Sequence, residues 1–193
     1  MTDATGLKDE KKRLRQEVLS RRAALYRMPR ARAALTHALD ALPDVRGRRL
    51  ALYAGFRDEL DPMPLVDELL RRGAVVGLPV VIGPRRPLVF RRYARNGRFT
   101  LSGFGIRELD ERTPVVVPEI VLAPLVAIDR RGVRLGYGGG FYDRTLAGWA
   151  ARGHRPKVFG LAFEAQLVPR LPRDRHDVRL DGLITEAGIR RFR

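Results

Sequence analysis

The sequence predicts a single-domain α/β protein with an open, mostly parallel Rossmann-like sheet flanked by helices. Three observations lead to this fold class. Short apolar runs typical of strands alternate along the chain with segments whose apolar residues recur at helical spacing. The strand–helix–strand spacing of residues 49–81 is that of a parallel βαβ unit. The 193 residues suit one core, and no internal repeat or long linker divides residues 1–193.

Two helices are expected at the start of the chain. The first covers residues 8–27, with Leu14, Val18 and Leu25 on one stripe, and Pro29 ends it. The second covers residues 30–42. Its inward-facing residues are Ala34, Leu35, Ala38, Leu39 and Leu42.

The βαβ unit follows. Residues 49–54 form an apolar strand. Asp61 suits a helix N-cap and Pro62 the first helical position, and Gly73 ends the helix. Residues 74–81 form the second strand, which is expected to lie parallel to the first.

Further strands are expected after this unit. Residues 88–93 fit a hairpin strand that ends near the turn dipeptide at residues 96–97. Later strands are expected at residues 115–117, 120–123, 125–128, 158–163 and, as the last strand, 182–185. A helix is expected at residues 142–152, after the glycine-rich loop.

The charge is strongly basic, with 38 Lys and Arg against 22 Asp and Glu, a net charge of +16. Either a polyanionic partner or an arginine-rich composition drift accounts for it, and both interpretations remain open. Residues 84–98 contain arginines and no acid. They fit a nucleic-acid patch less well than a solvated hairpin or a rim that attracts an anionic substrate.

There is no cysteine, no apolar run of the ~20 residues a membrane span needs, and no secretory signal, so we expect a cytoplasmic protein.

A glycine-rich loop, RLGYGGGFYD at residues 134–143, is the main candidate site. Successive backbone N–H groups before a helix start bind phosphate-like anions. The loop lacks the spacing of a Walker A or dinucleotide motif, so a flexible turn is the alternative. Asp143 is a candidate Mg²⁺ ligand.

Two other polar residues are candidates. Glu59 follows a strand's carboxyl end, where α/β sheets bind ligands, although a surface carboxylate would look the same. His176 is either a base or a structural histidine.

Four segments together resemble a known family. RLGYGGGFYDR (134–144) after APLVAID (123–129) resembles the signature of 5-formyltetrahydrofolate cyclo-ligases, also called methenyltetrahydrofolate synthetases. KKRLR (11–15), YAGFRDELDP (53–62) and the block 160–185 resemble further family segments, in the same order. The resemblance implies ATP- and Mg²⁺-dependent closure of 5-formyltetrahydrofolate to 5,10-methenyltetrahydrofolate, with release of ADP and phosphate, by a monomer without membrane or nucleic-acid partners.

The same resemblance implies residue roles. Catalytic roles fall on Lys11, Arg134 and Tyr142. The ATP-binding residues are Lys11, Lys12, Arg15, Arg134, Leu135, Gly136, Tyr137, Gly138, Gly139, Gly140, Phe141 and Tyr142. The folate-binding residues are Ala54, Glu59, Tyr137, Gly138, Gly139, Gly140 and Phe141. The magnesium ligands are Asp143 and Asp177.

The chain departs from the family pattern at three of its positions. Gly139 stands where some relatives have lysine, Ile128 where the family often has Phe, and Ala54 is small for its folate-side position. Two other functions remain open: an RNA-binding module, and a diverged relative that acts on another formamide-like substrate.

Overall fold

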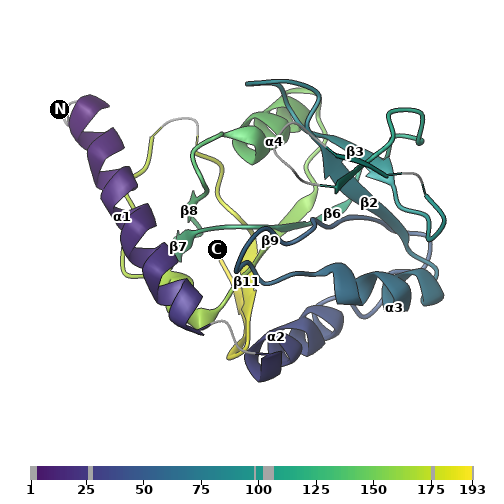
Figure 1. Cartoon of the computed structure of the whole chain (residues 1–193), viewed down its shortest axis with the longest axis horizontal. Helices are drawn as coiled ribbons and strands as arrows, with labels where there is room; N and C mark the ends of the chain where they lie inside the picture. The colour runs from purple at the N-terminus through teal and green to yellow at the C-terminus, as the bar shows by residue number, and fades with distance from the viewer. Residues whose placement is uncertain (1–3, 26–27, 98, 102–106, 175–176, 193) are drawn as a thin grey trace.

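A seven-stranded sheet forms the centre of the molecule (Figure 1). The computed structural model describes residues 4–25, 28–97, 99–101, 107–174 and 177–192. The strands of this sheet are β1 (Arg49–Ala51), β2 (Val75–Val80), β3 (Val89–Arg92), β6 (Ile120–Ala123), β9 (Lys157–Leu161), β11 (Gly182–Thr185) and β12 (Gly188–Arg191). Their order is β12-β11-β9-β6-β1-β2-β3, and only the edge strands β3 and β12 are antiparallel to their neighbours. The predicted open, mostly parallel sheet is confirmed.

Helices cover both faces of this sheet. They are α1 (Ala4–Leu25), α2 (Met28–Asp40), α3 (Val66–Arg71) and α4 (Phe141–Ala151), with 3₁₀ turns η1 (Met63–Leu65) and η2 (Glu164–Gln166). Figure 1 shows α4 on one face and α2 and α3 on the other. Because side chains alternate along a strand, β6 contributes side chains to the hydrophobic cores on both faces of the sheet. Ile120 and Leu122 pack with the α2 and α3 side, and Val121 and Ala123 with the α4 side.

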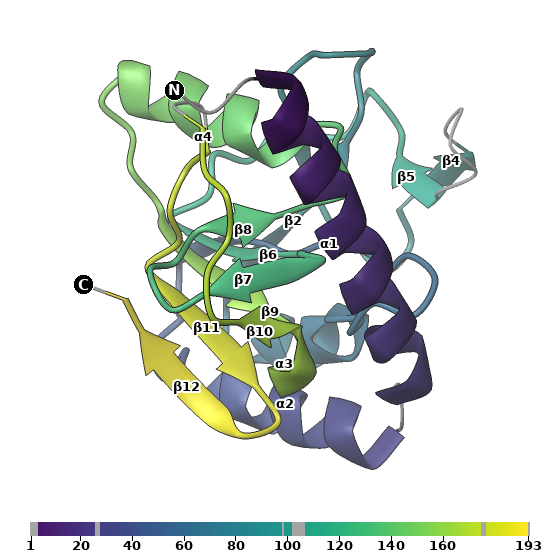
Figure 2. The same cartoon turned by 90° about the vertical axis from the view of Figure 1, so that its left-hand side faces the viewer.

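A second, three-stranded sheet supports α1. It contains β10 (Leu167–Val168), β7 (Ala127–Asp129) and β8 (Arg134–Leu135), in that order. Val18 of α1 is fully buried in a small core with residues of these strands, among them Ala127 and Leu135. Figure 2 shows α1 lying across this sheet. The first helix is therefore anchored over the strands that lead into the glycine-rich loop.

The βαβ unit forms as expected. β1 and β2 are parallel, and the helical segment between them consists of η1 and α3. The carboxylate of Asp61 accepts the N–H of Met63 at 3.1 Å, which satisfies a free donor at the start of η1. Pro29, by contrast, does not end the first helix, which closes at Leu25; it lies in the first turn of α2.

Several strand predictions were wrong in detail. The strand at 88–93 pairs with β2 and not across residues 96–97; a separate pair, β4 (Phe99–Leu101) and β5 (Arg107–Leu109), follows. Residues 115–117 form only an isolated antiparallel bridge, between Val115 and Arg91 of β3; Val116 is buried, whereas Val115 and Val117 are 60% and 46% exposed. The strand expected at 125–128 is shifted to β7, in the smaller sheet, and β12 follows the strand that was expected to be last.

The strand order places the candidate site. From β1 the chain first adds β2 on one side and later β6 on the other, so the order reverses between β1 and β6. Open α/β sheets bind ligands outside the carboxyl ends of the strands at such a reversal. No helix in the described part of the chain has the length and apolarity of a membrane span.

Candidate functional site

One cavity of about 1230 Å³ opens at the reversal between β1 and β6. Residues of α1, the segment after β1, the glycine-rich loop with α4, and residues 173–174 and 177–179 line it. Sites for one small ligand usually have ~300–1,000 Å³. This cavity therefore has room for two ligands side by side.

The basic face of α1 forms one wall. Lys11 Nζ lies 2.6 Å from Asp177 Oδ2 and 3.0 Å from Asp174 Oδ2. Burial opposes the charge of Lys11, but hydrogen bonds and attraction from the two aspartates outweigh it and raise its pKa. One turn later, Arg15 Nε donates to the carbonyl oxygen of Gly136 at 2.8 Å. Both cations thus face the glycine-rich loop or the segment beside it.

Lys12 points elsewhere. Its side chain is exposed, and it is not among the residues that line the cavity. Adjacent residues on a helix face different directions, which explains why Lys11 and Lys12 separate. The structure does not bring Lys12 into the site that the family resemblance implied.

The glycine-rich loop leads directly into α4. Gly138 and Gly140 have φ values of 106° and 65°, the left-handed region that favours glycine. Gly140 is the N-cap of the 11-residue helix α4, so the loop ends on free N–H groups at the positive end of a helix. A Cβ on Gly139 would lie 2.8 Å from the Phe141 ring. The backbone of this loop is built to approach an anion closely.

Arg134 and the start of α4 form the floor of this region. Arg134 Nη2 lies 2.8 Å from Asp143 Oδ2, and the Arg134 guanidinium lies 5.4 Å from the centre of the Tyr142 ring. The Tyr142 hydroxyl is buried without a hydrogen-bond partner in the described structure, and burial raises its pKa well above the ordinary value. It is therefore a neutral donor at the cavity wall, and a ligand oxygen could satisfy it.

The two expected metal ligands lie on neighbouring segments. Asp143 Oδ1 accepts the N–H of Val178 at 3.3 Å, next to Asp177, and both carboxylates line the cavity. Each is already paired with a cation, Asp143 with Arg134 and Asp177 with Lys11. No group of three or more His, Cys, Asp or Glu residues able to hold a metal occurs within the described residues. The pair fits Mg²⁺, which takes one or two carboxylates together with phosphate oxygens and water.

Glu59 lines the same cavity from the segment that follows β1. It is 6% exposed, and its Oε2 accepts the N–H of Phe56 at 2.9 Å. Burial raises its pKa to about 7. Ala54 and Tyr53 line the cavity beside it. A buried acceptor on an apolar wall suits a flat heterocycle with N–H donors.

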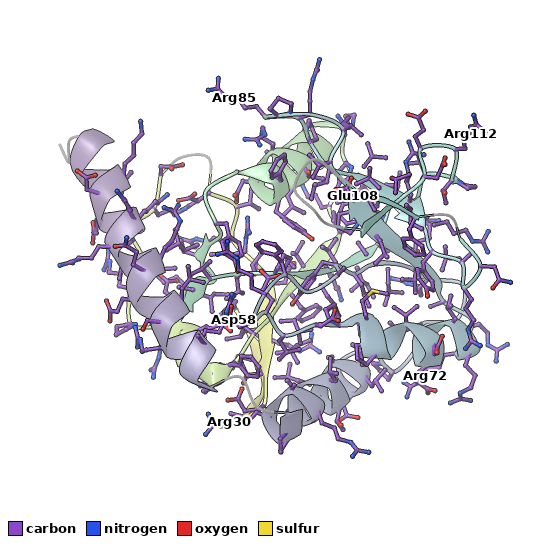
Figure 3. All side chains as sticks on the ribbon, in the orientation of Figure 1. Arg30, Asp58, Arg72, Arg85, Glu108 and Arg112 are labelled. Atoms are coloured by element: carbon purple, nitrogen blue, oxygen red, sulfur yellow. The ribbon has the colours of Figure 1, made fainter. Side chains whose placement is uncertain are left out.

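Two further groups were not singled out from the sequence. Arg22 of α1 is 1% exposed and binds Asp58 and Tyr137. Glu108 is 8% exposed, lines the cavity and accepts the N–H of Val81 at 3.2 Å. Figure 3 places Asp58 in the middle of the molecule towards α1, and Glu108 beside β2. The chain has many arginines, and nothing in the sequence distinguishes Arg22 as a buried one. The position of Glu108 beside the cavity depends on pairing between distant segments, which the sequence does not reveal.

The cavity therefore gathers most of the predicted residues. Ile128 is fully buried in a core, and His176 lies outside the described residues. The predicted residues that line the cavity are Lys11, Arg15, Ala54, Glu59, Arg134, Leu135, Gly136, Tyr137, Gly138, Gly139, Gly140, Phe141, Tyr142, Asp143 and Asp177.

Comparison with known proteins gives consistent results. The model of the 5-formyltetrahydrofolate cyclo-ligase family matches residues 7–186. The chain is 35% identical to 5-formyltetrahydrofolate cyclo-ligase of Escherichia coli K12 over 161 residues, 81% of this chain and 87% of the relative. It is 34% identical to that of Haemophilus influenzae over 179 residues, 89% and 95% of the two chains.

Solved structures agree with this result. The NMR structure of 5,10-methenyltetrahydrofolate synthetase from Aquifex aeolicus superposes with a TM-score of 0.77 at 30% identity, covering 95% of this chain and 93% of that one. The synthetase from Mycoplasma pneumoniae gives 0.71 at 25% identity, with 92% and 99% covered.

Proposed function

The chain belongs to the 5-formyltetrahydrofolate cyclo-ligase family of enzymes, and we propose that it converts 5-formyltetrahydrofolate to 5,10-methenyltetrahydrofolate with ATP and Mg²⁺, releasing ADP and phosphate. The whole chain, residues 1–193, would act as one domain. We propose that it acts as a monomer.

The single observation that carries the proposal is that two kinds of group line one cavity. Lys11, Arg15 and the glycine-rich loop offer positive charge and N–H groups. Glu59 offers a buried acceptor. A triphosphate suits the first group of residues, which we call the phosphate end, and the amino-pyrimidine edge of a pterin suits Glu59. Both ligands then meet over the glycine-rich loop.

The reaction needs a better leaving group than a formamide oxygen. The formyl oxygen attacks the γ-phosphorus of ATP, and the bond from that phosphorus to the β-γ bridging oxygen breaks to give ADP. N10 then attacks the activated formyl carbon, the carbon–oxygen bond breaks, phosphate departs, and N10 loses its proton. A nitrogen lone pair assists the departure of phosphate, and the product is a cation whose charge is shared by N5 and N10.

The protein's part in these steps is positioning and charge neutralisation. Lys11, Arg15 and Arg134 would neutralise the phosphates, with the N–H groups that precede α4. The Tyr142 hydroxyl, neutral and without a partner in the described structure, would donate to a phosphoryl or formyl oxygen. Glu59 would hold the pterin so that the formyl oxygen faces the γ-phosphate.

Magnesium would be held by Asp143 and Asp177. These carboxylates lie on adjacent segments at the phosphate end, and hard oxygen ligands suit the ion. When bound, the ion neutralises phosphate charge. Lys11 and Arg134, which hold the two carboxylates in the structure, would turn towards phosphate oxygens.

An omission assay tests the proposal. Product absorbance of 5,10-methenyltetrahydrofolate should grow only when ATP, Mg²⁺ and 5-formyltetrahydrofolate are all present. Arg15→Ala and Asp143→Ala should abolish most of this growth while the far-ultraviolet circular dichroism stays unchanged. Absence of product with pure, folded wild-type protein would refute the proposed reaction, and competition by other formamides would then identify a different substrate.

A further inference from the structure

Arg22 has the most buried guanidinium among the residues that the structure describes, and it lies outside the cavity wall. It is 1% exposed on the inner face of α1. Nε and Nη2 bind the two oxygens of Asp58 at 3.1 and 2.9 Å. Such paired hydrogen bonds fix the orientation of both groups. Burial opposes the charge, but Asp58 and Tyr137 outweigh it and raise the pKa of Arg22.

The same guanidinium reaches the glycine-rich loop. Its Nη2 donates to the Tyr137 hydroxyl at 2.6 Å, and the guanidinium lies 5.7 Å from the centre of that ring. The Tyr137 ring in turn meets the edge of Phe56, with centroids 6.2 Å apart. Phe56 and Asp58 belong to the segment 54–61, and Tyr137 to residues 134–143. Arg22 therefore joins two separate walls of the cavity.

The segment that Arg22 holds contains Glu59. Glu59 directly follows Asp58, and its carboxylate accepts the N–H of Phe56. The charged and titratable groups that act on Glu59 are Arg22, Asp58, Asp61, Tyr53, Tyr137 and Tyr142. Arg22 is the cation among them, and it favours the ionised form of Glu59 against burial.

Arg22 also shares a helix with the phosphate-end cations. Lys11, Arg15 and Arg22 are four and seven residues apart, a spacing that places them on one face of α1. Val18, between them, anchors that face in the small core over β7 and β8. A single anchored helix thus carries both the phosphate-end cations and the residue that binds the segment containing Glu59.

We propose that Arg22 is a positioning residue for the proposed reaction: by binding Asp58 and Tyr137 together, it fixes the Glu59 segment against the glycine-rich loop so that the two substrates are aligned. This inference rests on the proposed function. Arg22 touches neither ligand; it acts through Glu59 and Tyr137. Misplacing a substrate by about 1 Å can cost ~100-fold in rate, so the alignment has a measurable effect.

Steady-state kinetics of three variants test the role. Arg22→Met should raise KM for 5-formyltetrahydrofolate and lower kcat, each by about tenfold, with KM for ATP within about twofold, because Lys11, Arg15 and the backbone remain. Arg22→Lys keeps the positive charge but loses the paired N–H donors of the guanidinium, so it should show a smaller rise in KM for 5-formyltetrahydrofolate than Arg22→Met. Arg21→Gln is the matched control, since Arg21 pairs with Glu17 on the exposed side of the same helix, and it should match wild type.

The pH profile separates positioning from mere structural support. In Arg22→Met the rise of kcat/KM for the folate should move to higher pH, because Glu59 loses its cation. In Arg22→Lys it should stay in place. A loss of kcat with both KM values and the pH profile unchanged would overturn the proposal, since that pattern reports only a smaller folded fraction.

Hydrogen exchange gives a readout that does not depend on activity. Arg22→Met should speed exchange in both 54–61 and 134–143, and Arg21→Gln in neither. Faster exchange in one segment alone, or in neither, would overturn the linkage. Should Arg22→Met fail to fold, Arg22→Lys and Asp58→Asn carry the same comparison. If wild type makes no product, the proposed function fails, and the exchange pattern alone decides whether Arg22 joins the two walls.

Discussion

Lys11 Nζ lies 2.6 Å from Asp177 Oδ2, although 166 residues separate the two in the chain. The pair joins α1 to residues 177–179 at the wall of the cavity. It also joins a residue expected to bind phosphate to one expected to bind Mg²⁺. The charges of Lys11 and Asp177 offset each other in this pair, and ligand binding would exchange one set of ionic partners for another.

The first prediction concerns the two adjacent lysines. Lys11→Met should raise KM for ATP and lower kcat/KM by about 100-fold or more, because a charge-assisted phosphate contact is lost. Lys12→Met should change either value less than about twofold, since Lys12 is exposed and does not line the cavity. Initial rates across ATP concentrations measure both. Equal losses in the two variants would mean that α1 is rotated from the orientation described.

The second prediction concerns the metal. Asp143→Asn and Asp177→Asn should each raise the Mg²⁺ concentration for half-maximal rate by about tenfold, because each removes a charged oxygen ligand. Asp67→Asn serves as the control, since Asp67 forms an exposed pair with Arg95 away from the cavity. Titration of Mg²⁺ at fixed ATP gives the values. An unchanged Mg²⁺ requirement in both site variants would show that the metal is held by the nucleotide alone.

The third prediction compares two glycines at the ends of α4. Both Gly140 and Gly153 have positive φ, 65° and 78°, so alanine at either should cost about 1 kcal/mol of stability. At Gly140 the new Cβ would lie 2.7 Å from Arg144 Nη1, whereas nothing lies within 4 Å at Gly153. Gly140→Ala should therefore also raise KM for ATP several-fold. Thermal denaturation with ATP kinetics separates the effects, and equal KM values would contradict a close phosphate approach.

The fourth prediction is the pH dependence of folate binding. Burial raises the pKa of Glu59 to about 7, and the carboxylate is the better acceptor for pterin N–H groups. KM for 5-formyltetrahydrofolate should fall as pH rises from 6 to 8, by up to about tenfold. Glu59→Gln should have a high, pH-independent KM. A wild-type KM that does not vary across this range would remove Glu59 from the folate site.

The fifth prediction concerns stability. A carboxyl group whose pKa rises from 4.5 to about 7 on folding stabilises the fold fully below pH 4.5, and this contribution is lost as pH rises through 7. Glu59→Gln should thus be more stable than wild type at pH 8, by up to about 3 kcal/mol. The difference should vanish near pH 4. Urea denaturation at both values measures it, with the exposed Glu17→Gln as control. A less stable variant at pH 8 would show that Glu59 is ionised at little cost.

Local pattern gave much of the fold. The β1–α3–β2 unit and the core strands β6 and β11 are apolar runs bounded by turn residues, and these features act over short distances. Pairing across the chain was less predictable. Leu88–Tyr93 reads equally well as half of several hairpins, and only the free edge of β2 decides its partner. Val115 and Val117 have strand-like side chains, yet both are exposed beside β3, to which only a single bridge at Val115 joins this segment.

The sequence likewise identified some residues of the candidate site and missed others. Lys11 and Arg15 were named through the family resemblance, and glycine density marked the loop before α4. Lys12 was named as an ATP-binding residue because the KKRLR segment does not indicate which of its side chains face the cavity. Arg22 and Glu108 were missed because their burial depends on Asp58 and on β2, which local sequence does not bring near them.

The anchoring of α1 also sets the order in which the site can mature during synthesis. The helix leaves the ribosome first, yet Gly136 and Asp177, which bind Arg15 and Lys11, follow 121 and 166 residues later. At roughly 5–20 residues per second, a span of that length takes about 8–33 s to translate. The nascent chain therefore carries Lys11 and Arg15 before their partners in the folded protein have been made, and the proposed site can form only after Asp177 has been translated.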